Sequence, residues 1–542
     1  MRRPRKLAAV AVILIPLLAS GFLLQSRVQR ESSVLLEQVM SLVSDRFVDT
    51  LPQGAIYEKA ARGLIRELND PYTELLSPRD MKQFQSRTGG RYGGLGMSIQ
   101  LRDKQIVVER VFPNTPAERG GVREGDRIIQ VDTNSTRDWS TAQTADSLTG
   151  TPGTKVKVSF GRPGVAQPIS MELTRAIVHI PAVPYGMLFG SVGYVPLNQF
   201  NENASEELSR TIRDVVGRGA KGVVLDLRRN PGGILEQSLN VSNLFLRRGQ
   251  EIASVRARSG EQQQYVAQQQ PAFPNVPLIV LVDESSASAS EIVAGALQDH
   301  DRAVVIGQTT FGKGLVQSVF NLDGGYALKI TTAKWYTPSG RSIQRERSYV
   351  DGRFVEDTTR DSTETEASKK NRPVFKSDAG RTVYGGGGVT PDIIVADDTL
   401  TTTEQTFFRT VVSPKAAEFQ NALLDYALEL SKTVPKDAQV SPTWREELRR
   451  RFEAKGGTRA DAATWQGGAR WVDQQLERYV VRYAHGDSAV ARRELKFDRP
   501  LQRAIDMMNK GQTQRDLFNL AQSPAPTNTA RPARGQAASS RP

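Results

Sequence analysis

The stretch Leu278-Ile279-Val280-Leu281-Val282-Asp283-Glu284-Ser285-Ser286-Ala287-Ser288-Ala289-Ser290-Glu291 decides the fold class of this chain. Its first five residues are apolar, as in a fully buried strand, and a serine-rich turn follows them directly. Beyond the turn, Ile292, Ala296 and Leu297 fall on one helical face, which predicts a helix. Strand, turn and helix in this order are typical of an α/β fold, and such sheets carry functional groups where their strands end.

The same pattern recurs on both sides of this stretch. Val223–Leu227 is a second buried strand, and it ends in Arg228-Arg229-Asn230-Pro231-Gly232-Gly233. Val304–Ile306 is a third, and it leads to the loop Thr310-Phe311-Gly312-Lys313-Gly314. We therefore predict an α/β core over residues 176–396, a mixed sheet with flanking helices.

Ser288 and Lys313 are the pair in these loops with the clearest chemistry. A serine attacks a carbonyl only when a neighbouring group takes its proton, and a lysine does this once a dry pocket lowers its pKa. The chain has three histidines, and His300 would lie 12 residues beyond Ser288 on one helix, about 18 Å away along its axis. The sequence thus favours a Ser-Lys hydrolase.

Two structural alternatives compete with that interpretation. Ser288 and Glu291 also form a capping box, a helix-start motif that needs no catalysis. Gly307–Lys313 nearly spells a phosphate-binding loop, but no Ser or Thr follows the lysine, and the next residues alternate like a strand. The residues alone leave the nucleophile open among four serines: Ser285, Ser286, Ser288 and Ser290.

Composition excludes several other classes of function. The chain of 542 residues has no cysteine, which excludes disulfide scaffolds, thiolate metal sites and cysteine nucleophiles. Three scattered histidines argue against a catalytic zinc, so we expect no metal and no cofactor. The formal net charge is +13, but seven of the positive residues lie in the two terminal segments. The mild remaining charge, without a dense basic block, indicates no nucleic-acid partner.

The N-terminus predicts export. Leu7–Leu24 contains 18 residues without a charge and follows a basic start. This favours an anchor in the inner membrane, with the body on the periplasmic, extracytoplasmic side. Ala19-Ser20-Gly21 offers small residues for cleavage, so a signal peptide ending near residue 26 stays open.

Residues 27–87 predict helices, since Leu35, Val39, Leu42 and Val43 share one face. Residues 88–175 then change to short alternating strands around a helix at Thr141–Leu148, and this stretch resembles a PDZ domain. In such a domain the backbone N–H groups of Gly94, Leu95 and Gly96 would hold a peptide's terminal carboxylate while the peptide adds a strand. An ordinary glycine-rich hairpin is the alternative for this loop alone.

From about residue 35 to residue 395 the chain resembles the carboxyl-terminal processing peptidases, also called tail-specific proteases. The motifs that carry the resemblance are Asp226–Gly233, Ser286–Glu291, Thr310–Gly314 and Gly387–Ile393. The resemblance implies a serine endopeptidase that selects protein or peptide substrates by apolar C-terminal tails. It implies these roles: Ser288 as nucleophile, Lys313 as base, Gln317 as a supporting amide, and Ala289 with Gly232 or Gly233 as the oxyanion hole. A non-catalytic scaffold that kept the protease fold is the alternative.

Two regions lie outside the family pattern. The insert at residues 345–384 is polar and predicts a mobile surface loop. Residues 397–520 predict a helical extension, either a docking or assembly surface or a solvated cap, and a homo-oligomer could form through the helical regions. Residues 521–542 are rich in Pro, Ala, Thr and Ser and predict disorder.

Overall fold

The computed structural model describes residues 34–162, 165–345, 347–350, 353–356, 372–435 and 439–522. The chain divides into two compact units. The first unit comprises Met1–Met81, Gln317–Thr332 and Arg347–Glu356, and the second comprises the rest. Leu7–Leu24 and residues 523–542 lie outside the described residues, so the anchor and the tail stay predictions. No helix in the described part is long and apolar enough to span a bilayer.

The first unit combines helices with strands. A helix at residues 34–46 and α2 (Gln53–Glu67) agree with the helical prediction for this region. The sequence did not predict β1 (Glu74–Leu76), which pairs antiparallel with the start of β18 (Ala327–Tyr336). β18 also pairs with β17 (Leu315–Asn321), and the turn between them carries a short 3₁₀ segment at Asp323–Gly325. α3 (Pro78–Gly89) leads from this unit into the second.

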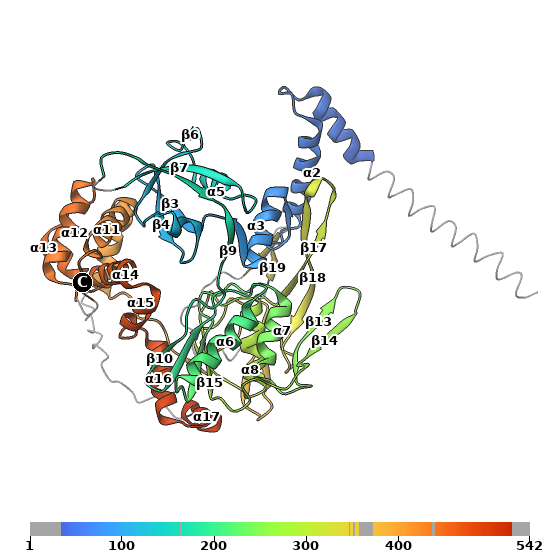
Figure 1. The fold of residues 1–542 in the computed structure, drawn as a ribbon. Helices are drawn as coiled ribbons and strands as arrows, with labels where there is room; N and C mark the ends of the chain where they lie inside the picture. Colours follow the sequence, from blue (N-terminus) through green and yellow to red (C-terminus); the bar gives the residue numbers. More distant parts are fainter. Residues whose placement is uncertain are drawn as a thin grey trace, which may run out of the picture. The chain divides into compact units, whose positions relative to one another are not determined.

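A six-stranded sheet forms the centre of the second unit (Figure 1). Its strands are, in spatial order, β10 (Met187–Phe189), β11 (Val192–Pro196), β12 (Gly222–Asp226), β15 (Leu278–Val282), β16 (Val304–Gly307) and β23 (Ile393–Ile394). β11 to β23 run parallel, and β10 is antiparallel at the edge. The predicted α/β core with a mixed sheet is confirmed.

Helices from distant parts of the chain cover the two faces of this sheet. One face packs against α6 (Ala204–Gly217), α7 (Leu235–Asn243) and α8 (Ala289–Asp299). The other face packs against α16 (Arg499–Lys510) and α17 (Gln514–Gln522) through Leu501, Met507 and Leu517. The end of the C-terminal extension therefore completes the core, as strands buried on both faces require.

A β-rich domain precedes the core. Its sheet has the order β3 (Met97–Arg102), β4 (Gln105–Val111), β5 (Arg127–Val131), β7 (Lys155–Gly161) and β8 (Ile169–Thr174), with β6 (Asn134–Ser135) on β5. α5 spans Thr141–Leu148, as predicted, and contacts β3 and β5. The short helix α4 (Pro116–Arg119) contacts β8. β2 (Arg91–Gly94) pairs with β9 (Ala176–His179) where the domain joins the core.

The remaining helices form a cluster around aromatic side chains. They are α10 (Thr402–Phe407), η2 (Phe408–Val412), η3 (Ser413–Lys415), α11 (Ala416–Leu430), α12 (Pro442–Ala454), α13 (Ala462–Gly467), α14 (Ala469–His485) and α15 (Asp487–Glu494). Phe407, Phe419, Phe452 and Trp465 are all buried in it. The cluster also holds the β-rich domain, since Asp103 accepts a hydrogen bond from Asn421 and pairs with Lys455.

The insert contains two hairpins that its polar composition did not predict. β19 (Arg347–Val350) pairs with β20 (Arg353–Glu356), and β21 (Val374–Lys376) pairs with β22 (Thr382–Tyr384). Residues 346, 351–352 and 357–371 of the insert lie outside the described residues. A further ribbon of the core, β13 (Glu251–Ala257) with β14 (Gln262–Val266), pairs with the end of β18.

Candidate active site

Three adjacent parallel strands bring the predicted site loops to one edge of the sheet. β12, β15 and β16 are neighbours, and each ends just before one of the loops that carry Gly232, Ser288 and Lys313. The loops are bonded to one another through the backbone. Ala287 donates its N–H to Asn230 O at 3.0 Å, and Phe311 donates to Ser286 O at 3.0 Å.

The four serines of the cluster differ in their surroundings. Ser286 and Ser290 are fully buried, and their hydroxyls donate to the carbonyls of Leu227 (2.8 Å) and Asn230 (2.9 Å). Ser285 is exposed, and its N–H donates to the Asp283 carboxylate. The hydroxyls of Ser286 and Ser290 therefore have structural partners within the fold.

Ser288 stands apart because its backbone is strained. It is partly buried at the N-cap of α8, with φ +55° and ψ −112°. Residues with a side chain rarely adopt this conformation, which costs roughly 1–3 kcal/mol and persists only when the surroundings impose it. The strained turn presents Ser288 at the positive end of the helix dipole.

The buried carboxylate of Glu291 joins the serine loop to the lysine loop. Its side chain is 0% exposed. Oε2 accepts the N–H of Ser288 at 2.8 Å and that of Lys313 at 2.9 Å. Oε1 accepts the N–H of Gly312 at 2.6 Å and the hydroxyl of Thr310 at 2.5 Å. Burial raises the pKa of Glu291, and these four donors act in the opposite direction by stabilising the ionised form.

This arrangement extends the predicted capping box. Within the motif, Glu291 accepts the Ser288 N–H, as a capping box requires. The same oxygen also accepts the Lys313 N–H, 22 residues away in sequence. No local pattern indicated that second contact, because the capping-box motif already accounted for the glutamate.

The backbone of Lys313 is fixed on both sides. Its N–H is held by Glu291, and its carbonyl accepts the indole N–H of Trp335 at 3.1 Å. Trp335 is 1% exposed, and its backbone N–H donates to Gly314 O at 3.0 Å. The Lys313 side chain is partly buried. In the sequence, Trp335 is one more apolar residue in the alternating pattern of β18, and no motif marks it as part of the site.

Gly232 and Gly233 lie beside the serine, and neither has room for a side chain. A Cβ on Gly232 would lie 2.7 Å from Ala287 O and 2.9 Å from both Ala289 N and Ser288 Cβ. A Cβ on Gly233 would lie 2.2 Å from Phe200 O. Both residues also have positive φ, +96° and +151°. These positions require glycine, which lets the backbone of this loop contact the serine turn.

The two glycine amides have different partners. The N–H of Gly232 donates to the side-chain oxygen of Asn230 at 2.9 Å. Asn230 is 0% exposed and donates in turn to Leu197 O. Among the described residues, no acceptor lies within hydrogen-bond reach of the N–H of Gly233 or of Ala289. Of the two glycines, Gly233 is the one whose N–H is available to a ligand.

Gln317 lies in the first unit, whereas Lys313 lies in the second. Within the first unit its side-chain amide donates to Thr331 Oγ1 at 3.4 Å, and Thr331 in turn donates to Asp70 at 2.5 Å. The supporting role of Gln317 at Lys313 stays a prediction.

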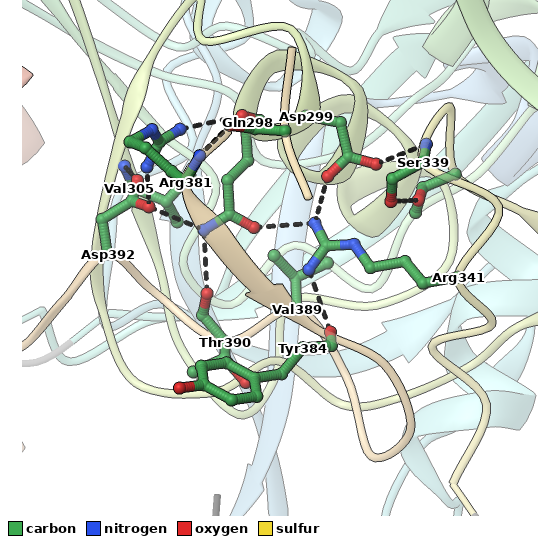
Figure 2. A network of polar contacts seen from close by, with 12 residues as sticks. Gln298, Asp299, Val305, Ser339, Arg341, Arg381, Tyr384, Val389, Thr390 and Asp392 are labelled. Atoms are coloured by element: carbon green, nitrogen blue, oxygen red, sulfur yellow. Dashed lines mark hydrogen bonds and ion pairs between the residues drawn. The ribbon is translucent and has the colours of Figure 1, made fainter. Parts of the chain in front are cut away.

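The far end of α8 is held by a buried polar network (Figure 2). Arg341 is 0% exposed and donates to the side chains of Gln298 and Asp299, each at 2.7 Å. Arg381 donates to Gln298 O and pairs with the Asp392 carboxylate. Both guanidinium groups face the C-terminal end of α8, where cations are favourable. The helix that begins at Ser288 is thus fixed at both ends.

The histidines lie elsewhere. His300 is at the C-cap of α8, opposite Ser288, and its ring nitrogens contact Asp378 Oδ2 at 2.8 Å and Glu251 O at 2.6 Å. His179 contacts Glu207 at 2.6 Å. Among the described residues no three metal-ligand side chains come together.

In the β-rich domain, the loop Gly94-Leu95-Gly96 directs its carbonyls inward. Leu95 O accepts the N–H of Ala117 at 2.8 Å, and Gly96 O accepts that of Phe112 at 2.9 Å. Gly96 has φ +83°, and a Cβ there would lie 2.3 Å from Thr115. Gly94 is the last residue of β2 and pairs with Ala176 of β9, and the binding of a peptide carboxylate by this loop stays a prediction.

Two models of known protein families match parts of this chain. The model of peptidase family S41 matches residues 191–351, and that of the PDZ domain matches residues 84–160. A carboxy-terminal-processing protease of Bartonella bacilliformis is 37% identical over 311 residues, which cover 56% of this chain and 71% of the relative. The chain belongs to the carboxy-terminal processing proteases.

Two further relatives of this protease family are similar over much the same region. The carboxy-terminal processing protease CtpA of Bacillus subtilis is 34% identical over 298 residues, 55% of this chain and 62% of the relative. The solved structure of a photosystem II D1 C-terminal processing protease is 29% identical and covers 60% of this chain and 91% of its own, with a TM-score of 0.33. The relatives support the serine endopeptidase and not the non-catalytic scaffold, and the PDZ domain is confirmed.

Proposed function

We propose that this serine endopeptidase uses Ser288 as its nucleophile and Lys313 as its general base. The observation that carries the proposal is the Glu291 carboxylate, which accepts the N–H of both residues on one oxygen. The strained φ of Ser288 adds support, and so do the structural partners of Ser286 and Ser290. Gln317 is proposed as the amide that supports Lys313.

The oxyanion hole is proposed to consist of the N–H groups of Ala289 and Gly233. Both amides have no acceptor among the described residues, and Ala289 is the first residue of α8. Gly232 contributes differently, because its N–H is held by Asn230 and its Cα lies against the serine turn. An oxyanion formed beside Ser288 would accept two hydrogen bonds and the favourable field of the helix.

The steps of the reaction follow from these roles. Neutral Lys313 takes the hydroxyl proton of Ser288 as Oγ attacks the scissile carbonyl. Ala289 and Gly233 stabilise the tetrahedral oxyanion. Protonated Lys313 then gives its proton to the leaving amine, which releases the new N-terminus and leaves an acyl-enzyme. Water, deprotonated by Lys313, hydrolyses the ester and restores Ser288.

Substrates are proposed to be chosen through the loop Gly94-Leu95-Gly96. The N–H groups of this loop would bind a free terminal carboxylate, and the tail would add a strand beside β3. Met97 and Ile99 of β3 are partly buried against the apolar core of this domain, and an apolar surface beside β3 would suit small or apolar tail residues.

The setting of the protease is also part of the proposal. We place its body outside the cytoplasm, on the periplasmic side, held to the inner membrane by Leu7–Leu24. The helix at residues 34–46 supports assembly into homo-oligomers, because Leu35, Val39 and Leu42 are exposed on it.

The catalytic assignment is tested by alanine variants assayed on an unfolded substrate with an apolar tail. Ser288→Ala and Lys313→Ala should each lower kcat/KM by about 10³-fold or more, and the double variant should be no worse, because the two groups act as a unit. Ser285→Ala is the matched control, since its side chain is exposed. An inactive Ser286→Ala beside an active Ser288→Ala would refute the assignment.

Tail recognition needs its own experiment. One unfolded substrate is offered with its C-terminus free, amidated, or extended by two aspartates. Amidation removes the charge that the N–H nest would bind, and aspartates do not suit an apolar groove, so both changes should slow cleavage. Equal rates for all three substrates would remove tail recognition while leaving the Ser-Lys chemistry intact.

A further inference from the structure

The loop that carries the N–H of Gly233 is strained at several residues. Between β12 and α7, Arg229 has φ +59°, and Gly232 and Gly233 have φ +96° and +151°. Arg229 has a side chain, and such residues rarely adopt a positive φ. A strained turn of this kind keeps its shape only where its surroundings impose it. The contacts that hold this loop therefore set the direction of the Gly233 N–H.

One of those contacts is made by the guanidinium of Arg228, directly before the strained Arg229. The Arg228 side chain is 10% exposed. One edge of its guanidinium donates to the Asp226 carboxylate, with Nε 3.0 Å from Oδ1 and Nη2 2.7 Å from Oδ2. Asp226 also accepts the hydroxyl of Tyr194 at 2.8 Å. Because Asp226 is the last residue of β12, this edge ties the guanidinium to the end of the strand.

The other edge of the Arg228 guanidinium binds the C-terminal extension. Nη1 donates to Asp498 Oδ1 at 2.8 Å, and Nη2 donates to Asp498 Oδ2 at 2.7 Å. Two parallel charge-assisted bonds of this kind add both strength and a fixed geometry. Asp498 is the N-cap of α16, and its Oδ1 also accepts the N–H of Leu501 at 3.0 Å. The aspartate is therefore held in place by a helix that packs on the central sheet.

We propose that Asp498 is a positioning residue for the oxyanion hole, acting through Arg228 on the loop that carries Gly233. The inference rests on the proposed role of the Gly233 N–H. Without the aspartate, Nη1 of Arg228 loses its acceptor, and a buried charge that has lost a partner is unfavourable. The arginine then moves toward water and the strained backbone next to it relaxes. That movement takes the N–H of Gly233 away from the developing oxyanion.

The expected effect is a loss of kcat with KM nearly unchanged. Asp498 binds the loop from the side of α16 and acts on the substrate only through Gly233, whose N–H bond strengthens in the transition state. A shift of about 1 Å in a catalytic group costs about 10²-fold in rate, and complete loss of one oxyanion donor costs about 10²–10³-fold. We expect Asp498→Ser to lower kcat by about 10- to 100-fold.

The variants separate the ion pair from the helix cap. Serine is as good an N-cap as aspartate, so Asp498→Ser keeps the start of α16 while Arg228 loses both carboxylate oxygens. Asp498→Asn keeps the cap and one oxygen, and should lose less kcat. Asp461→Ser is the matched control, because Asp461 caps α13 by accepting the N–H of Thr464 at 2.7 Å. Urea unfolding of each variant checks that it is folded.

The oxyanion hole is probed on the full chain with two inhibitors, acetyl-Ala-Leu-valinal and acetyl-Ala-Leu-valinol. Ser288 Oγ adds to the aldehyde carbon, and its hydroxyl proton passes to the former carbonyl oxygen, which then lies in the oxyanion hole. The alcohol has no carbonyl carbon to attack, so it binds by ground-state contacts alone. The ratio of the two Ki values therefore reports transition-state binding. Asp498→Ser should lower the preference for the aldehyde by about the same factor as kcat.

The outcomes separate this inference from the proposed function. A parallel loss of kcat and of aldehyde preference in Asp498→Ser, with Asp461→Ser unchanged, supports the positioning role. An unchanged aldehyde preference overturns it and leaves the Ser-Lys chemistry standing, and so does a rise in KM alone. If Asp498→Ser does not fold, the same readings on Asp498→Asn decide. If the native protein binds both inhibitors equally well, the proposed site itself is refuted, and the inference fails with it.

Discussion

Replacing Glu291 by glutamine tests whether one buried carboxylate sets the catalytic geometry. The change removes the charge and one acceptor oxygen but keeps the size of the side chain. In the native protein the two oxygens accept four hydrogen bonds, from the amides of Ser288, Gly312 and Lys313 and from the Thr310 hydroxyl. A glutamine NH₂ is a donor, so whichever side it takes, it faces two groups that also donate.

The loss of stability expected for Glu291→Gln depends on which of the two oxygen positions the glutamine NH₂ group takes. It does least harm beside Thr310, because that hydroxyl can rotate and accept, which leaves the buried N–H of Gly312 without an acceptor. One unsatisfied buried donor costs about 1–3 kcal/mol, and the remaining bonds lose their charge-assisted strength. We expect the free energy of unfolding to fall by about 2–4 kcal/mol in total. A shift of about 1 Å between Lys313 and Ser288 would lower kcat about 10²-fold.

The assay compares kcat, KM and urea unfolding for the native protein, Glu291→Gln and Glu284→Gln. Glu284 is exposed in the same loop, so its variant makes the same chemical change without the buried contacts. We expect only Glu291→Gln to lose kcat, with KM nearly unchanged because the PDZ domain is not altered. A destabilised Glu291→Gln enzyme with normal kcat would refute the reasoning, since the carboxylate would then serve only the start of α8.

Three further predictions concern the fold and its assembly. Leu501→Ala should lower the free energy of unfolding by about 2–5 kcal/mol, measured by urea denaturation, because the side chain is 2% exposed against the central sheet. A hydrogen bond from Arg470 holds the pKa of Glu404 at about 2, so this group's stabilisation is complete above its ordinary value of 4.5 and is lost as pH falls toward 2. Glu404→Gln should remove that acid-side slope in the unfolding free energy. Leu35→Glu with Leu42→Glu should shift sedimentation of the chain from residue 27 toward the monomer, and an unchanged profile would exclude this face as the contact.

The sequence predicted the centre of the fold because its signals are local. Short apolar runs such as Leu278–Val282 are typical of buried strands in a chain that alternates strands with helices. The loops that follow neighbouring parallel strands then lie at one edge of the sheet. β1 gave no such signal, since Glu74–Leu76 is too short for any period to show. It forms because β18 offers it a partner from more than 250 residues away in sequence.

The role of α16 and α17 depends on contacts that no local pattern reports. β12 and β15 are buried along their whole length, which means that both faces of the sheet need a cover. The helices α6 to α8, which follow β11, β12 and β15 in the chain, supply only one face. The unmatched face was a sign that a distant segment must pack there, and Leu501 and Met507 do so.

At the site, the sequence predicted residue types better than hydrogen-bond partners. The sequence does not distinguish the roles of Gly232 and Gly233. Only the structure shows that the side-chain oxygen of Asn230 accepts the N–H of Gly232. Glu291 is a second example, because the capping box accounted for it fully and its contact with Lys313 could not be inferred from the sequence.

The placement of the insert explains how this chain can carry it without disturbing the proposed pair of Ser288 and Lys313. The chain leaves the core at Arg345, whose N–H donates to Gly312 O, and after the insert Val389 donates to Thr310 Oγ1 at 2.7 Å. The Thr310 hydroxyl in turn donates a hydrogen bond to Glu291, so both ends of the insert are joined to the loop that the carboxylate orders. At the other end of α8, about 16 Å away, Arg341 and Arg381 hold the helix in the same way. Arg345 and Arg381 belong to the insert and lie near its two ends, so the length of the segment between them can change while Ser288 and Lys313 keep their bonds to Glu291.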